Sequence, residues 1–180
     1  MDSVDWRVQD RFLDLRSQWL TLIGEHLQDT QGEIREYWRI EKADSVVILP
    51  LLNHQIILPS PSYRPGLGIA TLDFPGGRVP AYQSPQTVVP AILNRELGIE
   101  AAAIANLTAL NQQGWPVNSS FSNQTLYGLI AELQPDTPIA PDFLGATYET
   151  TKEGVESLLK DLLCLQCRTV LLEWHRSFEY

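Results

Sequence analysis

The stretch that decides the fold is residues 73–99, DFPGGRVPAYQSPQTVVPAILNRELGI. An apolar strand leads into its Pro-Gly-Gly turn, and a helix follows. Ser84 suits the N-cap, and Pro85 suits the first helical position, where its missing N–H does no harm. Gly98 suits the left-handed residue that ends a helix. We therefore predict a strand, a glycine turn and a helix over 85–97, with the rest of the chain arranged around them.

Composition limits the classes of protein to which the chain can belong. Its 180 residues suffice for one core of usual size, and 44% hydrophobic with 19% charged residues indicate a globular chain. The net charge of −9 argues against binding along a nucleic-acid backbone, which requires a basic face. Residues 1–14 lack the apolar core of a signal peptide, and the apolar runs are too short to span a bilayer. We therefore expect a cytoplasmic protein with no nucleic-acid or membrane partner.

The order of expected elements predicts an α+β domain with a mixed sheet covered by helices. Large apolar residues at near-helical spacing predict an amphipathic helix over 6–19. The continuous apolar run at 45–52 predicts a strand buried on both faces. The other expected strands are 19–26, 34–42 (after a turn at 29–32), 56–58 and 124–133, and the other expected helices are 152–163 and 169–178.

Four segments carry a resemblance to a known family. They are Tyr37-Trp38-Arg39, Tyr63-Arg64-Pro65, Asp73–Gly77 and the serine-rich loop and strand at 119–132. Together with the element order they resemble the Nudix hydrolases, and within them the ADP-ribose pyrophosphatase-like branch. The resemblance implies an α/β/α sandwich, a Mg²⁺-dependent hydrolase of nucleotide derivatives and a homodimer. It also implies two parts: an N-terminal helix and strand arm over 1–43, used in the dimer interface, and a Nudix-like domain over 44–180.

The defining box of that family fits at both ends but not inside. When the box starts at Gly77, its last glycine and apolar residue fall on Gly98 and Ile99 without a gap. At the positions where the family has acids, this chain carries, in order, Gln83, Ile92, Arg95 and Glu96. Of these four residues, Glu96 alone is an acid. The resemblance is therefore to a degenerate Nudix box.

Metal chemistry explains why this matters. Mg²⁺ requires several oxygen ligands, and glutamates at i, i+3 and i+4 of a helix share one face. Here that face carries Ile92, Arg95 and Glu96. The remaining metal ligands are the Glu96 carboxylate and the carbonyl of Gly76, so we expect weak or lost Mg²⁺ binding.

A second register keeps more acids. Arg95-Glu96-Leu97 repeats the arginine-glutamate-apolar triplet of the box, which makes Glu96 and Glu100 an i, i+4 pair of catalytic acids. This register requires a four-residue insertion and loses the match at Gly98. It predicts an active Mg²⁺-dependent hydrolase of nucleoside-diphosphate derivatives.

The resemblance implies further ligand-binding residues. Arg64 is expected to face a ligand phosphate, Trp38 to stack on a base, and Asp73 and Gly77 to lie at the pocket edge. Each also has a simpler interpretation: Arg64 as a solvated loop cation, and Trp38 as a packing residue. The two cysteines, Cys164 and Cys167, form a CxxC motif that follows a helical pattern, so we interpret them as semi-buried thiols rather than a redox motif, which would open a helix.

Three functions follow from these residues. The first is a Nudix-fold protein with little or no hydrolase activity that binds a nucleotide-type ligand or a protein. The second is the active hydrolase that uses Glu96 and Glu100. The third is an interaction module without a ligand.

Overall fold

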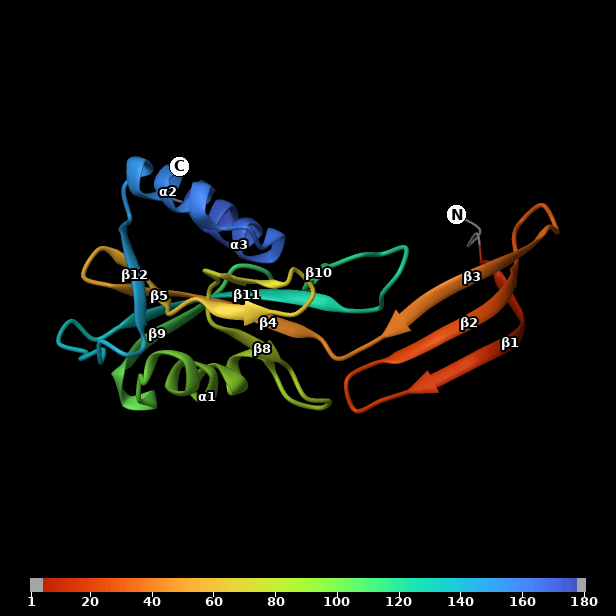
Figure 1. The fold of residues 1–180 in the computed structure, drawn as a ribbon, viewed down its shortest axis with the longest axis horizontal. Coiled ribbons are helices and arrows are strands. Elements are labelled where there is room, and N and C mark those ends of the chain that lie inside the picture. The colour runs from red at the N-terminus through yellow and green to blue at the C-terminus, as the bar shows by residue number, and fades with distance from the viewer. Residues whose placement is uncertain (1–4, 178–180) are drawn as a thin grey trace. The chain divides into compact units, whose positions relative to one another are not determined.

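A computed structural model describes residues 5–177, which divide into two compact units (Figure 1). The first unit consists of the described part of Met1–Ala43 together with Pro116–Thr125. The second consists of Asp44–Trp115 and the described part of Leu126–Tyr180. Residues 116–125 lie within the predicted second part, 44–180, but their contacts group them with the first unit.

The first unit is a three-stranded antiparallel sheet in the order β1-β2-β3. Its strands are β1 (Arg7–Arg16), β2 (Thr21–Gln28) and β3 (Ile34–Glu41). The predicted turn at 29–32 joins β2 to β3: Asp29 accepts from the backbone of Gln31 and Glu33, and Gly32 has a φ of +83°. The returning loop 116–125 is held on β3 by the Ile40 N–H, which donates to the Phe121 carbonyl at 2.8 Å, and by the Tyr37 hydroxyl, which donates to the Ser120 carbonyl.

The N-terminal helix predicted over 6–19 is wrong, because the segment forms strand β1. The ring of Phe12 lies over Gly24 of β2, where a Cβ atom would come within 2.5 Å of a ring carbon. The same ring contacts His26 at a centroid distance of 5.0 Å and Trp38 at 5.3 Å. Cross-strand aromatic pairs of this kind stabilise a sheet, and they override the helical spacing of the apolar residues.

The second unit contains a seven-stranded mixed sheet. The path is β10-β11-β4-β5-β12, with β8 paired to β4 and β9 paired to β11. Strands β4 and β11 are parallel, whereas β11 with β9, β12 with β5, and β4 with β5 and with β8 pair antiparallel. A separate hairpin joins β6 (Ser62–Arg64) to β7 (Ile69–Thr71). The sheet strands are β4 (Ser45–Leu52), β5 (Gln55–Pro59), β8 (Gly76–Arg78), β9 (Ile104–Ala109), β10 (Trp115–Pro116), β11 (Thr125–Leu133) and β12 (Leu144–Glu149).

Helices cover both faces of this sheet, so the α+β sandwich predicted from the sequence is confirmed (Figure 1). Helix α1 (Pro85–Leu97) packs on one face, where Val46 and Ile48 of β4 meet Val89 and Leu93. Helices α2 (Lys152–Asp161) and α3 (Leu165–Arg176) pack on the other face, around Val47 and Leu49 of the same strand. Strand β4 is therefore buried on both faces, as its unbroken apolar sequence predicts. A short 3-10 turn, Ala101–Ala103, follows α1.

The helix boundaries match the sequence signals closely for α1 and less closely for α3. Helix α1 begins at Pro85 and ends before Gly98, which has a φ of 67°. Helix α3 was predicted over 169–178 but begins at Leu165, and the predicted end at 178 lies outside the described residues. The N-cap of α3 is Cys164, a residue that sequence rules do not recognise as a cap. None of the helices in residues 5–177 is both long and apolar enough to cross a membrane.

Candidate functional site

The last turns of α1 face strand β8, and this contact is the centre of the candidate site. Ile92 is 3% exposed and packs on Gly77, where a Cβ atom would lie 2.9 Å from the Ile92 Cδ1 atom. Arg95 and Glu96 follow one turn later and reach the preceding residue, Gly76. The three residues at i, i+3 and i+4 thus share one helix face, as the spacing predicts.

Both polar backbone groups of Gly76 are bound by neighbouring side chains of α1. The Gly76 N–H donates to Oε2 of Glu96 at 3.3 Å. Nη2 of Arg95 donates to the Gly76 carbonyl at 3.0 Å and also to Oε1 of Glu96. Glycine is required here because a Cβ atom would lie 2.9 Å from the Val46 carbonyl of β4.

The donor set at Gly76 does not fit a divalent metal. The resemblance assigns the Gly76 carbonyl and the Glu96 carboxylate as metal ligands, and the Arg95 guanidinium binds both. Within residues 5–177, no group of three His, Cys, Asp or Glu side chains close enough to share an ion includes Glu96. One carboxylate paired with a guanidinium falls short of the oxygen ligands that Mg²⁺ requires.

Glu100 lies outside the helix on which the second register depends. Helix α1 ends at Leu97, so Glu96 and Glu100 are not an i, i+4 pair on one helix face. The Glu100 carboxylate instead accepts from the Asn94 side-chain amide at 3.0 Å. The geometry that would bring these two acids together by helical spacing is therefore absent.

Arg64 and Asp73 form a half-buried ion pair at the segment that leads into the glycine turn. Nε of Arg64, at the end of β6, donates to Oδ2 of Asp73 at 2.6 Å, and the Thr71 hydroxyl donates to the same oxygen at 2.8 Å. Asp73 is 8% exposed, while 46% of the Arg64 side chain is exposed. The guanidinium therefore has a structural partner on one side and solvent on the other.

Trp38 belongs to the first unit, whereas the other predicted site residues belong to the second. Its indole N–H donates to Glu36 at 2.7 Å, and its ring packs edge-on against Phe12. Direct contacts thus support the interpretation of Trp38 as a packing residue, although the residue is 43% exposed.

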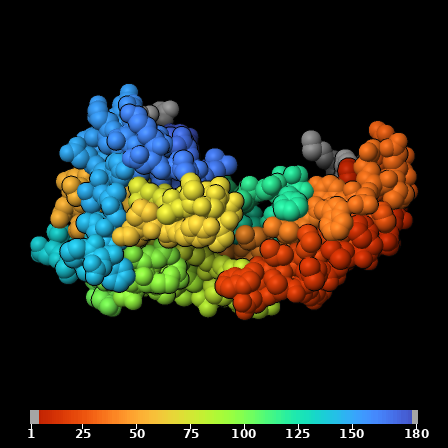
Figure 2. Space-filling model, viewed as in Figure 1, coloured from red at the N-terminus to blue at the C-terminus, as the bar shows by residue number. Residues whose placement is uncertain are grey.

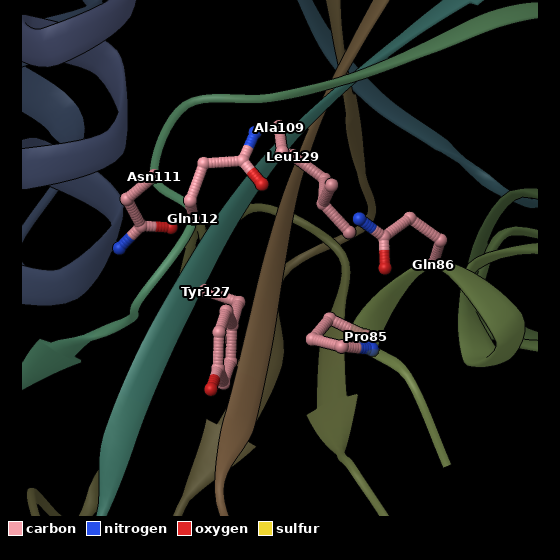
Figure 3. A pocket seen from close by; sticks show the side chains of 7 residues that line it. All are labelled: Pro85, Gln86, Ala109, Asn111, Gln112, Tyr127 and Leu129. Atoms are coloured by element: carbon pink, nitrogen blue, oxygen red, sulfur yellow. The ribbon is translucent and has the colours of Figure 1, made fainter.

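A pocket of about 260 Å³ lies near the beginning of α1 (Figure 3). Its lining comes from three elements: the start of α1, the end of β9 with the loop after it, and β11. Asn111 in this lining is already occupied, since its amide binds the backbone of Leu126 and Gly128. None of the lining residues is among the ligand-binding residues predicted from the sequence; they are Pro85, Gln86, Ala109, Asn111, Gln112, Tyr127 and Leu129.

The CxxC motif contacts Asp73, which the sequence does not predict. Phe74 N–H donates to Sγ of Cys167 at 3.4 Å, and the Cys167 thiol donates to Oδ1 of Asp73 at 3.9 Å. These residues are more than 90 positions apart in the chain, so no local pattern signals their contact.

Comparison with solved structures supports a Nudix-like fold. A crystal structure described as that of an ADP compounds hydrolase superposes with a TM-score of 0.78 and 19% identity. The match covers 99% of this chain and 97% of the other. No family model and no curated protein sequence matches the chain. At this identity the likeness establishes the fold, and the chemistry must come from the residues themselves.

Proposed function

We propose that this chain is a Nudix-fold protein that binds a nucleotide-type ligand and hydrolyses it little or not at all. The observation that carries the proposal is the Arg95 guanidinium, which binds the Gly76 carbonyl and the Glu96 carboxylate. A fixed positive charge there disfavours a metal cation by Coulomb repulsion. Without a metal, the attacking water is not activated and the charge on the leaving phosphate is not stabilised in the way a metal ion would provide.

The same guanidinium supplies a direct anchor for a phosphate. Its contacts within the described residues run through Nη2, and 60% of the side chain is exposed, which leaves the outer edge of the guanidinium for an anion. Arginine pairs with phosphate through two parallel N–H bonds, which are among the stronger hydrogen bonds in proteins. Arg95 would then hold a diphosphate in place of Mg²⁺. The likeness to the ADP compounds hydrolase supports a nucleotide derivative as the ligand class.

Binding and turnover are tested on the full chain with ADP-ribose. In EDTA, we expect ADP-ribose to raise the melting temperature saturably, because a ligand of the native state stabilises it by mass action. Arg95→Ala should abolish the shift. Lys160→Ala, which removes a cation from the last turn of α2, should leave it unchanged. A shift identical in Arg95→Ala would contradict the anchor, and the absence of any shift with a panel of nucleotides would favour a protein-binding module.

The alternative is an active hydrolase that uses Glu96 and Glu100. The end of α1 at Leu97 speaks against it, because Glu100 no longer shares the helix face. Incubation with ADP-ribose and Mg²⁺ or Mn²⁺ discriminates the two functions. Turnover that Glu96→Gln abolishes would overturn the proposal of a ligand binder.

We further infer a homodimer that uses the first unit. The described part of this unit exposes several large apolar side chains, which are Trp6, Val8, Phe12, Leu15, Trp19, Leu20, Ile34 and Trp38. Exposure of so many large apolar side chains in one small unit is typical of association surfaces. Sedimentation should give the mass of two chains, and a monomeric mass at all concentrations would refute the inference.

A further inference from the structure

The CxxC motif opens helix α3, contrary to the interpretation drawn from the sequence. Cys164 is the N-cap, and the Arg168 N–H donates to the Cys164 carbonyl at 3.0 Å in the first helical turn. Cys167 lies three residues further, in that same turn. These are the only two cysteines in the chain, and both are free thiols.

The two thiols differ in their surroundings. Cys164 is partly exposed, whereas Cys167 is 2% exposed and packs in the core between α3 and the sheet. The sulfur atoms and a carboxylate oxygen of Asp73 lie within 4.8 Å of one another. One thiol is therefore accessible to a reagent in solution, and the other is accessible to the first thiol.

Asp73 supplies a proton acceptor for the buried thiol. Its Oδ1 atom accepts from the Cys167 thiol, while its Oδ2 atom is held by Arg64 and Thr71. Because Oδ2 is anchored, Oδ1 is directed at the sulfur. In Figure 2 the segment around residues 60–72 lies on the surface directly beside helices α2 and α3 of the same unit.

Hydrogen bonding separates the proton affinities of the two thiols. The single Cys167 S–H is shared between Oδ1 of Asp73 and the Cys164 sulfur. Its bond to Cys164 lowers the pKa of Cys164 to about 6, with help from the backbone N–H groups of Cys167 and Gln166 and against the effect of burial. The bond with Cys164, together with burial, raises the pKa of Cys167. Near neutral pH the accessible sulfur is the thiolate, which is the nucleophilic form, and the buried sulfur keeps its proton.

We propose that Cys164 and Cys167 form a redox-active dithiol that exchanges with low-molecular-weight disulfides, with Cys164 as the attacking and Cys167 as the resolving thiol. The Cys164 thiolate attacks one sulfur of the reagent, whose S–S bond breaks and releases one thiolate. A mixed disulfide on Cys164 results. Cys167 then passes its proton to Asp73 and attacks the Cys164 sulfur, which expels the second reagent thiolate.

The electrons and protons of this exchange balance. The two cysteines lose two electrons and form one disulfide, while the reagent disulfide gains two electrons and becomes two thiols. The two protons come from Cys164, on ionisation, and from Cys167, by way of Asp73 and solvent. The reaction is reversible, so the reagent thiol reduces the protein disulfide again.

Oxidation would act on the segment that precedes the glycine turn. A disulfide has no S–H group, so Asp73 loses the donor at Oδ1 and keeps Arg64 and Thr71 at Oδ2. Phe74, whose N–H is bound by Cys167, is followed by Pro75, Gly76 and Gly77. The dithiol therefore contacts the segment that leads into the candidate site at Gly76. The proposed exchange does not depend on which ligand that site binds.

The test is a redox titration of the full chain in mixtures of reduced and oxidised glutathione. After acid quench and alkylation, intact mass should show reduced chains with two alkyl groups and oxidised chains with none and two hydrogens fewer. No oxidised form in oxidised glutathione alone would overturn the proposal. So would one tightly bound Zn²⁺ per reduced chain that blocks both thiols throughout the titration.

Two single variants test the roles of the thiols. Cys167→Ser should accumulate a mixed disulfide with glutathione on Cys164, because the resolving thiol is gone. Cys164→Ser should react at least about tenfold more slowly, because the remaining thiol is buried and protonated. Equal rates in the two variants would overturn the assignment. The titration of the unmodified chain remains decisive if either variant fails to fold.

Asp73→Asn tests the proton acceptor. We expect the mixed disulfide on Cys164 to form at the normal rate and its resolution to slow, a split that general destabilisation would not produce. Resolution at the unchanged rate would remove Asp73 from the mechanism.

Discussion

Arg95 binds the carbonyl oxygen of Gly76 at 3.0 Å, which fixes a cation against the glycine turn. The adjacent Glu96 carboxylate accepts from both Gly76 and Arg95, so the three residues form one closed set of hydrogen bonds. In this chain, a metal ion would have to displace the guanidinium before it could reach the carbonyl and the carboxylate.

Replacing the arginine should therefore open the position to a metal. We expect Arg95→Glu to bind Mn²⁺ measurably, since two neighbouring carboxylates and a carbonyl then face the same point. The unmodified chain should bind Mn²⁺ more weakly by at least about tenfold. Electron paramagnetic resonance of free Mn²⁺ measures both, and Arg7→Glu, which makes the same change of charge on strand β1, serves as the control. Equal affinity in the unmodified chain and in Arg95→Glu would show that the guanidinium does not exclude the cation.

The two glycines of the turn should differ sharply from a loop glycine in their tolerance of a methyl group. Gly76→Ala places a Cβ atom 2.9 Å from the Val46 carbonyl, which is backbone and cannot move aside easily. We expect a loss of about 1–3 kcal/mol in the free energy of unfolding, measured by urea denaturation. Gly66→Ala, where nothing lies within 4 Å, should be close to neutral. A neutral Gly76→Ala would contradict the close approach of β8 to β4.

Gly77→Ala should be recoverable by a second change. The added Cβ atom meets Cδ1 of Ile92 at 2.9 Å, and this atom is the end of a side chain rather than backbone. Ile92→Val removes that atom, so the double variant should unfold at higher urea concentration than Gly77→Ala alone. Additive losses in the two single variants and the double variant would contradict the contact.

The Arg64 and Asp73 pair should contribute to stability because the carboxylate is buried. Arg64→Ala leaves Asp73 with Thr71 and Cys167 only, and we expect a loss of about 1–2 kcal/mol, moderated by the exposure of the guanidinium. Arg16→Ala, which breaks an exposed pair with Asp14, should lose less. Equal losses in the two variants would indicate that Asp73 is well solvated.

Alkylation of Cys164 should follow its lowered pKa. The thiolate fraction rises through pH 6, so the rate with iodoacetamide should increase between pH 5 and 7 and level off above. The groups facing this thiol are Cys167, which lowers its pKa by hydrogen bonding, and Asp73, which raises it by charge. Alkylation of the urea-unfolded chain, whose thiols have an ordinary pKa of about 8.5, should instead still become faster between pH 7 and 9. If the alkylation rate of the folded chain also rose between pH 7 and 9, the lowered pKa of Cys164 would be contradicted.

Local signals predicted α1 and β4 well because the sequence of each element contains the features that define it: capping residues for α1 and a continuous apolar run for β4. Ser84, Pro85 and Gly98 mark the ends of α1, and the helix runs between them. The unbroken apolar run of β4 indicates burial on both faces, and packing by α1 and by α2 with α3 confirms it. The spacing within α1 also predicted that Ile92, Arg95 and Glu96 would share a face.

Long-range contacts explain what could not be predicted. Strand β1 has helical spacing, but its conformation is decided by Phe12 on Gly24 of the neighbouring strand. Gly98 predicted the end of α1, which separates Glu100 from Glu96. The second register ignored this signal because it relied on the repeated arginine-glutamate-apolar triplet. The contact of Cys167 with Asp73 joins segments that no periodicity connects.

The return of residues 116–125 to the first unit has a consequence for dissecting the protein genetically. The chain leaves the first unit after Ala43, re-enters it at Pro116 and leaves it again after Thr125, so the division is not a single cut in the polypeptide. An expression clone that begins at Asp44 would retain the loop but delete Ile40, Lys42 and Ala43, to which Phe121, Asn123 and Gln124 are bonded. Neither unit can be inherited, swapped or truncated as one uninterrupted module.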